Sequence, residues 1–184
     1  MVQRYNILGR YTNQCLCLCS HAWPVEVSHG KIRVRLNDNT AFSGCKQLKQ
    51  ISVDKENAIF DSRNNCNAII ETASNKLLYG CKNTIIPPNV SIIGEAAFLE
   101  NEEITSIVIP EGIESIEPYA FYGCKNLKSI YSYVKDPTAC FIHVSAFFEH
   151  GDNVVLYVPK GTADVYRNAQ DGWQIFNDLQ EFNT

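Results

Sequence analysis

Apolar residues in the middle of the chain recur at fixed distances from a repeated Ala-Phe pair. The pair occurs four times, as Ala41-Phe42, Ala97-Phe98, Ala120-Phe121 and Ala146-Phe147. After the first three pairs, Cys or Asn follows the phenylalanine by three positions, and apolar residues follow it by six and by nine. In this order the residues are Cys45, Asn101 and Cys124, then Leu48, Ile104 and Leu127, then Ile51, Ile107 and Ile130. A register kept over three offsets indicates an internal structural repeat.

The residues before the phenylalanines keep the same register. Apolar residues precede Phe98 and Phe121 by five and by eight positions, and a proline precedes each by eleven. These residues are Ile93 and Ile116, Val90 and Ile113, and Pro87 and Pro110. Phe121 follows Phe98 by 23 residues, which falls within the period of leucine-rich repeats, roughly 20–29 residues. The chain is therefore predicted to contain short leucine-rich units that stack on one another.

Each unit contains a stretch that is typical of a short strand. The pattern L-x-x-L-x-L fits residues 48–53, 104–109 and 127–132. Only Ser132 departs from it, at the last apolar position. Alternate side chains of a strand point to opposite faces, so the apolar positions predict an inward face and the others an outward face. Pro110 cannot continue a ladder, and Glu111-Gly112 after it predicts a turn. Phe121 is expected inside the coil, where neighbouring units complete one another's core.

One unit is longer than the others. Phe42 and Phe98 are 56 residues apart, more than twice the 23-residue period, and the excess falls within residues 54–82. Two apolar runs, Ala68–Thr72 and Lys76–Gly80, flank a polar turn there and predict a β-hairpin. The hairpin has two interpretations, a protruding recognition loop or a variant that only lengthens the coil. We favour the second.

The repeat becomes irregular after Ile130. Pro137 and residues 141–148 are predicted to belong to an irregular last turn. Residues 154–158 are predicted to be the final strand, which Pro159 ends.

The C-terminal residues are predicted to form a cap. Thr162 can cap a short helix that runs to about Arg167. Trp173, Phe176 and Leu179, each three residues apart, continue an apolar stripe. Because an open end of a repeat array exposes core, we expect Trp173 to plug that end rather than to hold a ligand.

These patterns divide the chain into three parts. Residues 41–159 form the repeat array and residues 160–184 its C-terminal cap. Residues 1–40 do not fit the repeat, because Asn37 stands where the register expects an isoleucine. This first part is an N-terminal cap, a degenerate repeat or a non-native segment.

The repeat resembles a known family. The stretch IPEGIESIEPYAFYGCKNLKSI (109–130) is closely similar to the BspA-type leucine-rich repeats of bacterial surface proteins. Residues 158–176 resemble the C-terminal cap of Bacteroides-type members, and residues 64–98 a longer unit that recurs in them. The resemblance covers roughly residues 41–176. It implies a β-rich, right-handed solenoid of short strands with few short helices and a C-terminal cap. It also implies a cell-surface or secreted protein linked with adhesion and host contact.

Composition narrows the possible functions. The chain has 184 residues, of which 45% are hydrophobic and 20% charged, so it can fold around a core. A net charge of −4 without a Lys/Arg run argues against nucleic-acid binding. The small basic cluster 31–35 alternates with apolar residues like a strand. No apolar run is long enough to span a membrane. The N-terminus has no convincing signal peptide, which leaves a removed export signal or a cytoplasmic protein as alternatives.

The eight cysteines offer little chemistry. Cys45, Cys81 and Cys124 each lie between Gly and Lys, and the first and third share one repeat position, which indicates packing and inert thiols. Near the N-terminus a Cys/His group invites a metal-site interpretation, although its C-x-C-x-C spacing is unlike zinc sites. This group comprises Cys15, Cys17, Cys19, His21 and His29. No catalytic or nucleotide-binding motif occurs around the other histidines, His143 and His150.

We therefore expect a binding module that is not an enzyme and needs no cofactor or metal. Its partner would be an unidentified protein or glycan, its oligomeric state is open, and the acidic cluster Glu100, Glu102 and Glu103 is expected to be a solvated edge. The outward strand positions would supply the contacts, with the tyrosines as anchors, although Tyr131 could instead only pack on its cross-strand neighbour. The candidates are Gln50, Ser52, Ser106, Val108, Ser129, Tyr131 and Tyr133. The alternatives are a metal protein or enzyme that uses the N-terminal Cys/His group, and a structural spacer in a larger surface protein.

Overall fold

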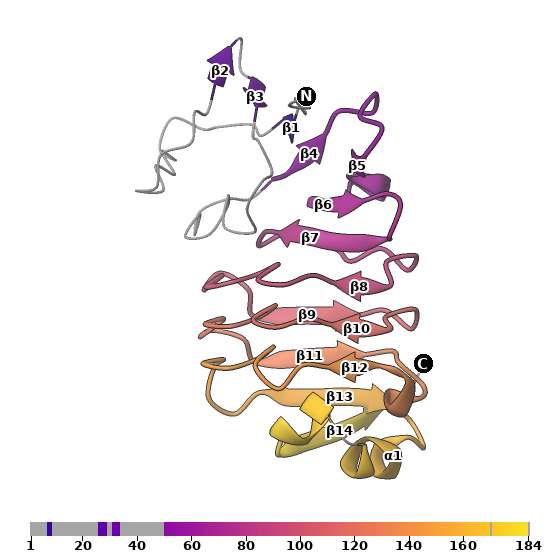
Figure 1. The fold of residues 1–184 in the computed structure, drawn as a ribbon. Helices are drawn as coiled ribbons and strands as arrows, with labels where there is room; N and C mark the ends of the chain where they lie inside the picture. The colour runs from indigo at the N-terminus through magenta and orange to yellow at the C-terminus, as the bar shows by residue number, and fades with distance from the viewer. Residues whose placement is uncertain (1–6, 9–25, 29–30, 34–49, 170, 184) are drawn as a thin grey trace.

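The structure is a stack of coils with short strands on two sides (Figure 1). It is a computed structural model that describes residues 7–8, 26–28, 31–33, 50–169 and 171–183. Over these residues the strands form three sheets. The chain descends the stack coil by coil from β6 to β14, so residues about one repeat apart lie in neighbouring layers.

The first sheet is antiparallel, with the order β2 (Glu26–Ser28), β3 (Lys31–Arg33), β1 (Ile7–Leu8) and β4 (Ser52–Val53). The second sheet has the order β12 (Phe141–Ile142), β10 (Ser115–Ile116), β8 (Ile92–Ile93), β7 (Lys76–Gly80), β6 (Ala68–Glu71) and β5 (Phe60–Asp61). The third sheet has the order β14 (Asp178–Phe182), β13 (Val155–Pro159), β11 (Ser129–Ser132) and β9 (Ser106–Ile109). The helical segments of the described part are η1 (Arg63–Asn65), η2 (Pro137–Ala139), α1 (Ala163–Asn168) and η3 (Asp171–Ile175).

The parallel strands pair in the register that the sequence repeat predicts. In the second sheet, Ile116 lies opposite Ile93 on one side and Ile142 on the other. In the third sheet, β9, β11, β13 and β14 are all parallel neighbours. The strands expected within 104–109 and 127–132 are therefore confirmed as β9 and β11. Of the stretch 48–53 the structure describes residues 50–53, and their strand β4 joins the first sheet and not the third.

A column of phenylalanine rings runs through the core. Phe121 stacks on Phe98 with ring centroids 4.9 Å apart and on Phe147 with centroids 4.8 Å apart, and all three are fully buried. The column ends above Phe98 at Gly80, where a Cβ atom would lie 2.0 Å from the Phe98 ring. The glycine therefore leaves the space into which the uppermost ring packs.

The predicted hairpin is confirmed as β6 and β7, which pair antiparallel. It does not protrude, because Leu77 of β7 pairs in parallel with Ile93 of β8, and Ile69 and Ile70 of β6 are fully buried. The hairpin therefore belongs to the second sheet and lengthens the coil.

The expected irregular last turn is confirmed at Pro137, which begins the inserted segment η2, and is wrong for residues 141–148. Ile142 pairs in register with Ile116, and Phe147 continues the ring column. Ile142 follows Ile116 by 26 residues, whereas Ile116 follows Ile93 by 23. The segment η2 occupies the corner before β12, where the Asp136 carboxylate accepts a hydrogen bond from the Thr138 N–H. Because the added residues are confined to this corner, the register of the next coil is kept.

The expectation that 154–158 is the final strand is also wrong, because β14 adds to β13 in parallel. The predicted helix is present as α1, but the Thr162 hydroxyl donates to the Pro159 carbonyl and does not cap it. The Glu181 carboxylate in β14 instead accepts hydrogen bonds from the N–H groups of Gly161 and Ala163. The helix start is thus held by a strand that the sequence pattern did not reveal.

Ser132, which breaks the apolar pattern, is fully buried in a hydrogen-bond network. Its hydroxyl lies 2.6 Å from the Tyr166 hydroxyl of α1, which donates to the Val134 carbonyl at 2.6 Å. The Val134 N–H donates to the Ser132 oxygen at 3.3 Å. The polar groups satisfy one another, so the network holds α1 against the end of β11 without an unpaired hydroxyl.

Replacing Phe121 with alanine is expected to lower the free energy of unfolding by about 3–5 kcal/mol, because the cavity would interrupt the ring column. Urea denaturation measures the loss. The control is Phe141→Ala, whose ring is 51% exposed and should cost less than about 1 kcal/mol. Equal losses in the two variants would contradict the role given to the column.

Replacing Tyr166 with phenylalanine is expected to cost about 1–3 kcal/mol, because it leaves the Ser132 hydroxyl and the Val134 carbonyl buried without this partner. The matched control, Tyr133→Phe, removes a hydroxyl from a side chain that is 41% exposed and should change stability by less than about 0.5 kcal/mol. Thermal unfolding of the two variants compares them directly. A Tyr166→Phe protein as stable as the wild type would show that the network does not stabilise the fold.

Candidate binding face

The outer side of the third sheet carries an ordered set of polar and aromatic side chains. Along β9 and β11 buried and accessible residues alternate, so Ile107, Ile109 and Ile130 point into the core while their neighbours point out. We call the outward set the strand face. Its members are Ser106, Val108, Ser129, Tyr131, Tyr133, Tyr157 and Phe182.

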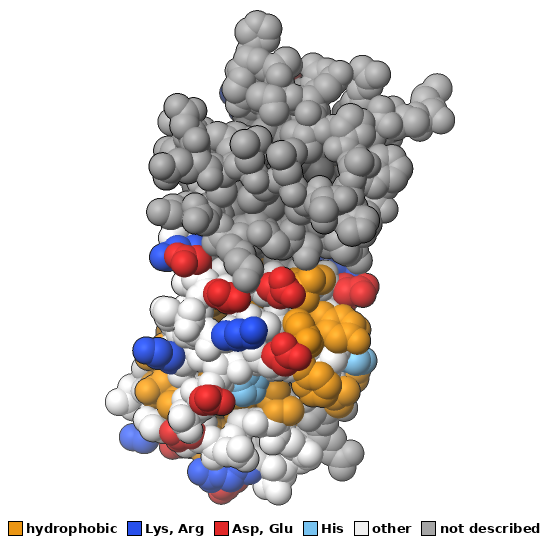
Figure 2. Space-filling model, turned by 90° about the vertical axis from the view of Figure 1, so that its left-hand side faces the viewer, with side chains coloured by type: hydrophobic (Ala, Val, Ile, Leu, Met, Phe, Trp, Pro, Cys, Tyr) orange, Lys and Arg blue, Asp and Glu red, His pale blue; other side chains and the backbone are white. Residues whose placement is uncertain are grey.

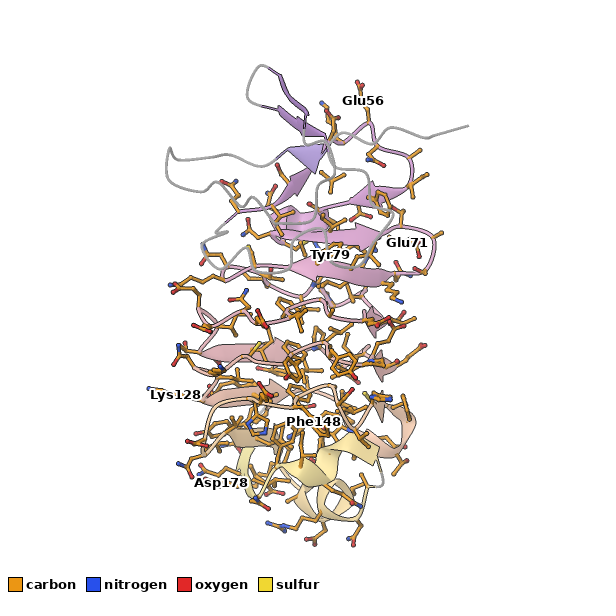
Figure 3. The ribbon with its side chains drawn as sticks, turned by 60° about the vertical axis from the view of Figure 1, so that its left-hand side comes forward. Glu56, Glu71, Tyr79, Lys128, Phe148 and Asp178 are labelled. Atoms are coloured by element: carbon orange, nitrogen blue, oxygen red, sulfur yellow. The ribbon has the colours of Figure 1, made fainter. Side chains whose placement is uncertain are left out.

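Two serines form the first row of the strand face. Ser129 lies opposite Ser106 in the parallel register, and its hydroxyl donates to the Ser106 hydroxyl over 2.9 Å. Lys128 directly precedes β11, and Asp178 is the first residue of β14. Both are exposed and lie at the same margin of the stack (Figure 3). This margin therefore combines hydroxyl groups with charges of both signs.

Aromatic residues form the second row. Tyr131 lies opposite Val108 and Tyr157, and the two tyrosine rings stack with centroids 4.6 Å apart and an interplanar angle of 7°. The ring of Phe182 meets those of Tyr131 and Tyr133 edge to face, at 6.0 and 5.1 Å. Because the stacked tyrosines cover each other's faces, they offer a ligand their edges and hydroxyl groups. The expected packing of Tyr131 on a cross-strand neighbour is therefore confirmed, and its half-buried ring leaves the anchor role a prediction.

The structure brings together five of the seven candidate residues. Ser106, Val108, Ser129, Tyr131 and Tyr133 all lie on or next to the third sheet. Of the other two, Ser52 belongs to β4 in the first sheet, and Gln50 is an exposed residue just before it.

The prediction that Gln50 and Ser52 belong to the same surface as the other five residues is therefore wrong. They share the sequence pattern of β9 and β11, but their segment pairs with β1 instead of continuing the third sheet.

Two members of the strand face were not predicted. Tyr157 alternates with buried residues in β13, so the pattern of that strand could have identified it. Phe182 had no such signal, because the segment around it was not recognised as a strand.

The described histidines serve packing and local turns. The N–H of Ser145 and its hydroxyl both lie within hydrogen-bond distance of His143 Nδ1, at 3.2 and 2.8 Å. Ser145 is only 5% exposed, so this pair fixes a turn and does not present a nucleophile to a substrate. His150 stacks on Phe176, and its Nδ1 lies 2.6 Å from the Gly151 carbonyl.

The four cysteines of the described part, Cys66, Cys81, Cys124 and Cys140, are buried free thiols. Burial raises the pKa of Cys124 and of Cys140 to about 12, and it also raises the pKa of Cys66 and Cys81. The Cys124 thiol lies 3.3 Å from the Phe98 carbonyl in the coil above, which fits the packing role expected of the Gly-Cys-Lys positions.

Cys45 and the N-terminal group of Cys15, Cys17, Cys19, His21 and His29 lie outside the described residues. Within the described part, no group of three or more His, Cys, Asp or Glu side chains is arranged to hold a metal ion. In the same part, no helix has both the length and the apolar character to cross a lipid bilayer.

Cys124 and Cys140 are expected to resist iodoacetamide at pH 8 in the folded protein and to react after denaturation, because the thiolate is the reactive form. Peptide mass spectrometry measures each site separately. Since an unfolded thiol ionises near pH 9 and these folded thiols only near 12, they also make the fold less stable as the pH rises through this interval. Rapid alkylation of both sites without unfolding would contradict the buried positions.

Comparison with known protein families agrees with this repeat architecture. The BspA type leucine rich repeat region matches residues 62–168 in six copies. No curated protein matches the chain. A similar solved structure is the crystal structure of the pneumococcal vaccine antigen PcpA, with a TM-score of 0.36 and 14% sequence identity over 74% of this chain and 51% of that one. The chain thus spans about half the length of that structure. Because the family match covers more than half of the sequence, the protein belongs to the BspA-type leucine-rich repeat family.

Proposed function

We propose that the chain is a non-catalytic binding module that engages a protein or glycan through the strand face. The observation that carries the proposal is the row of Tyr131 and Tyr157, stacked beside the paired hydroxyls of Ser106 and Ser129. Tyrosine combines a large contact area with a hydrogen-bonding tip and few rotatable bonds. Stacking fixes the rings before a ligand arrives, so binding loses little further side-chain entropy.

The proposal also includes a C-terminal cap on the repeat array. We infer that residues 160–184 close one end of a right-handed solenoid and keep its core from water. Trp173 is 2% exposed, and the Phe176 ring packs on Phe147 at 5.1 Å, against the last ring of the column. A Cβ atom on Gly172 would lie 2.4 Å from Ile142, so η3 is in close contact with the last coil. These contacts support a cap, which a repeat array needs in order to stay soluble.

The proposed location is the cell surface or the extracellular space, with adhesion or host contact as the task. Membership of the BspA-type family supports this assignment. A strand face that presents hydroxyls and tyrosine edges also fits polar extracellular ligands, because such groups exchange hydrogen bonds with water for hydrogen bonds with protein or sugar. A structural spacer would need no such ordered surface.

The experiment is a binding screen of the purified chain against extracellular matrix proteins and a glycan array. For each ligand found, Tyr131→Ala and Ser106→Arg are expected to weaken binding about tenfold or more, because they remove an anchor or block the serine row. The matched control is Val165→Ser, which changes a 42% exposed side chain on α1, outside the strand face. The strand-face proposal fails if every affinity is unchanged in both variants. A screen without any ligand favours the spacer.

A further inference from the structure

A second accessible surface lies on the side of the stack where the Ala-Phe turns reverse the chain. In each turn the residue after the core phenylalanine points outward, giving Leu99, Tyr122 and Phe148 in successive coils. Backbone hydrogen bonds join these turns, from the N–H of Glu100 to Tyr122 and from the N–H of Gly123 to Phe148. The three outward residues therefore form one continuous column.

We call this surface the turn face. It comprises Leu99, Glu100, Tyr119, Tyr122, Val144, Phe148 and Glu149. It is more open than the strand face, with Tyr119 exposed to 45%, Phe148 to 49% and Val144 to 58%. The space-filling view shows hydrophobic side chains gathered at one margin of this side of the stack, with carboxylates beside them (Figure 2). Phe148 is labelled on the same side, which Figure 3 brings forward.

Two tyrosines form a corner on the turn face. The rings of Tyr119 and Tyr122 meet edge to face, with centroids 5.8 Å apart and an interplanar angle of 78°. Rings at this angle present two walls and not one flat platform. This corner therefore suits a compact group better than the broad face of a sugar ring. On the strand face, by contrast, the rings of Tyr131 and Tyr157 are nearly parallel.

Carboxylates flank the corner. The backbone bonds between the turns bring Glu149 and Glu100 next to Tyr122, and the pKa of Tyr122 is raised mainly by the nearby Glu149 carboxylate, with smaller contributions from burial and from the charge of Glu100. The Glu100 side chain lies over Gly123, where its Cγ would be 3.2 Å from an added Cβ atom. No ion pair joins Glu100 or Glu149 to a basic side chain within the described residues. The corner thus combines electron-rich ring faces with carboxylates that form no ion pair in the described part of the chain.

We propose that the turn face binds a partner polypeptide by taking one of its Lys or Arg side chains into the corner of Tyr119 and Tyr122. A cation is attracted by ring faces within about 6 Å, and both carboxylates add to this attraction. Phe148 and Val144 then offer an apolar surface to the neighbouring residues of the same peptide. The partner is therefore a basic peptide segment with apolar residues. Its binding to the turn face does not depend on the strand face.

The test uses two capped peptides, acetyl-Gly-Arg-Gly-Leu-Gly-amide and the same peptide with citrulline in place of arginine. Citrulline keeps the shape and loses the charge. Titration of the isotope-labelled chain, followed by amide chemical shifts, should locate the arginine peptide at residues 96–100, 119–123 and 144–149. The citrulline peptide should bind at least about fivefold more weakly than the arginine peptide. Added salt should lower the affinity of the arginine peptide.

The variants keep the turn intact. Tyr119 has a φ of 58°, a conformation that glycine adopts freely, so Tyr119→Gly removes the ring without straining the turn. Ala96, at the equivalent position one coil above, has a φ of 56°, so Ala96→Gly is the matched control. Tyr119→Gly and Glu149→Gln should each lower the affinity for the arginine peptide at least about threefold. The controls Ala96→Gly and Glu111→Gln should leave that affinity unchanged.

Three results would overturn the proposal. They are equal binding of the citrulline peptide, shifts located away from the turn face, and unchanged affinity in both Tyr119→Gly and Glu149→Gln. Amide shifts outside residues 96–149 also report whether each variant remains folded. Because Tyr131→Ala leaves the turn face untouched, it should bind the arginine peptide normally even if the strand face has no ligand.

Discussion

The rest of the structure depends on the in-register stacking of each coil on the next. The centroids of the Phe121 ring and of its neighbours Phe98 and Phe147 lie 4.9 and 4.8 Å apart, so the middle coil is positioned by the two that enclose it. A strand shifted by one residue would turn its buried side chains outward, because successive side chains alternate between faces. Such a shift is unfavourable because the phenylalanine rings would no longer stack. The isoleucines of the second sheet would also lose the isoleucines opposite them.

Stacking also decides what the surface looks like. Parallel in-register strands place equivalent residues side by side, so a serine or tyrosine that recurs at one position becomes a row. Buried positions are constrained by volume, whereas outward positions are free to carry recognition chemistry. The strand face and the turn face follow from one repeat but differ in geometry. Tyr131 and Tyr157 stack in parallel, while Tyr119 and Tyr122 form a corner between carboxylates.

The sequence predicts the stacked units because burial repeats every coil, and Phe121 or Ile130 must be apolar wherever the register is kept. It fails where a partner distant in sequence decides the structure. β14 is a strand because it pairs with β13, and Glu181 is a helix cap because that pairing brings it to Gly161. The turn face was missed for a related reason. Glu100 was interpreted as part of a solvated edge, since Tyr122 and Glu149 approach it only through stacked turns.

The turns between the strands show how such a fold can change in length without losing its register. The added residues before β12 are taken up by η2, and Ile142 still pairs with Ile116. The inserted segment buries Val134, Pro137 and Cys140, so it adds to the core while it lengthens the chain between β11 and β12. The strands at the two sides hold the register, and a surface ordered by that register needs little further organisation to bind. A short array can therefore present two separate surfaces, because each depends on the same core but not on the other's side chains.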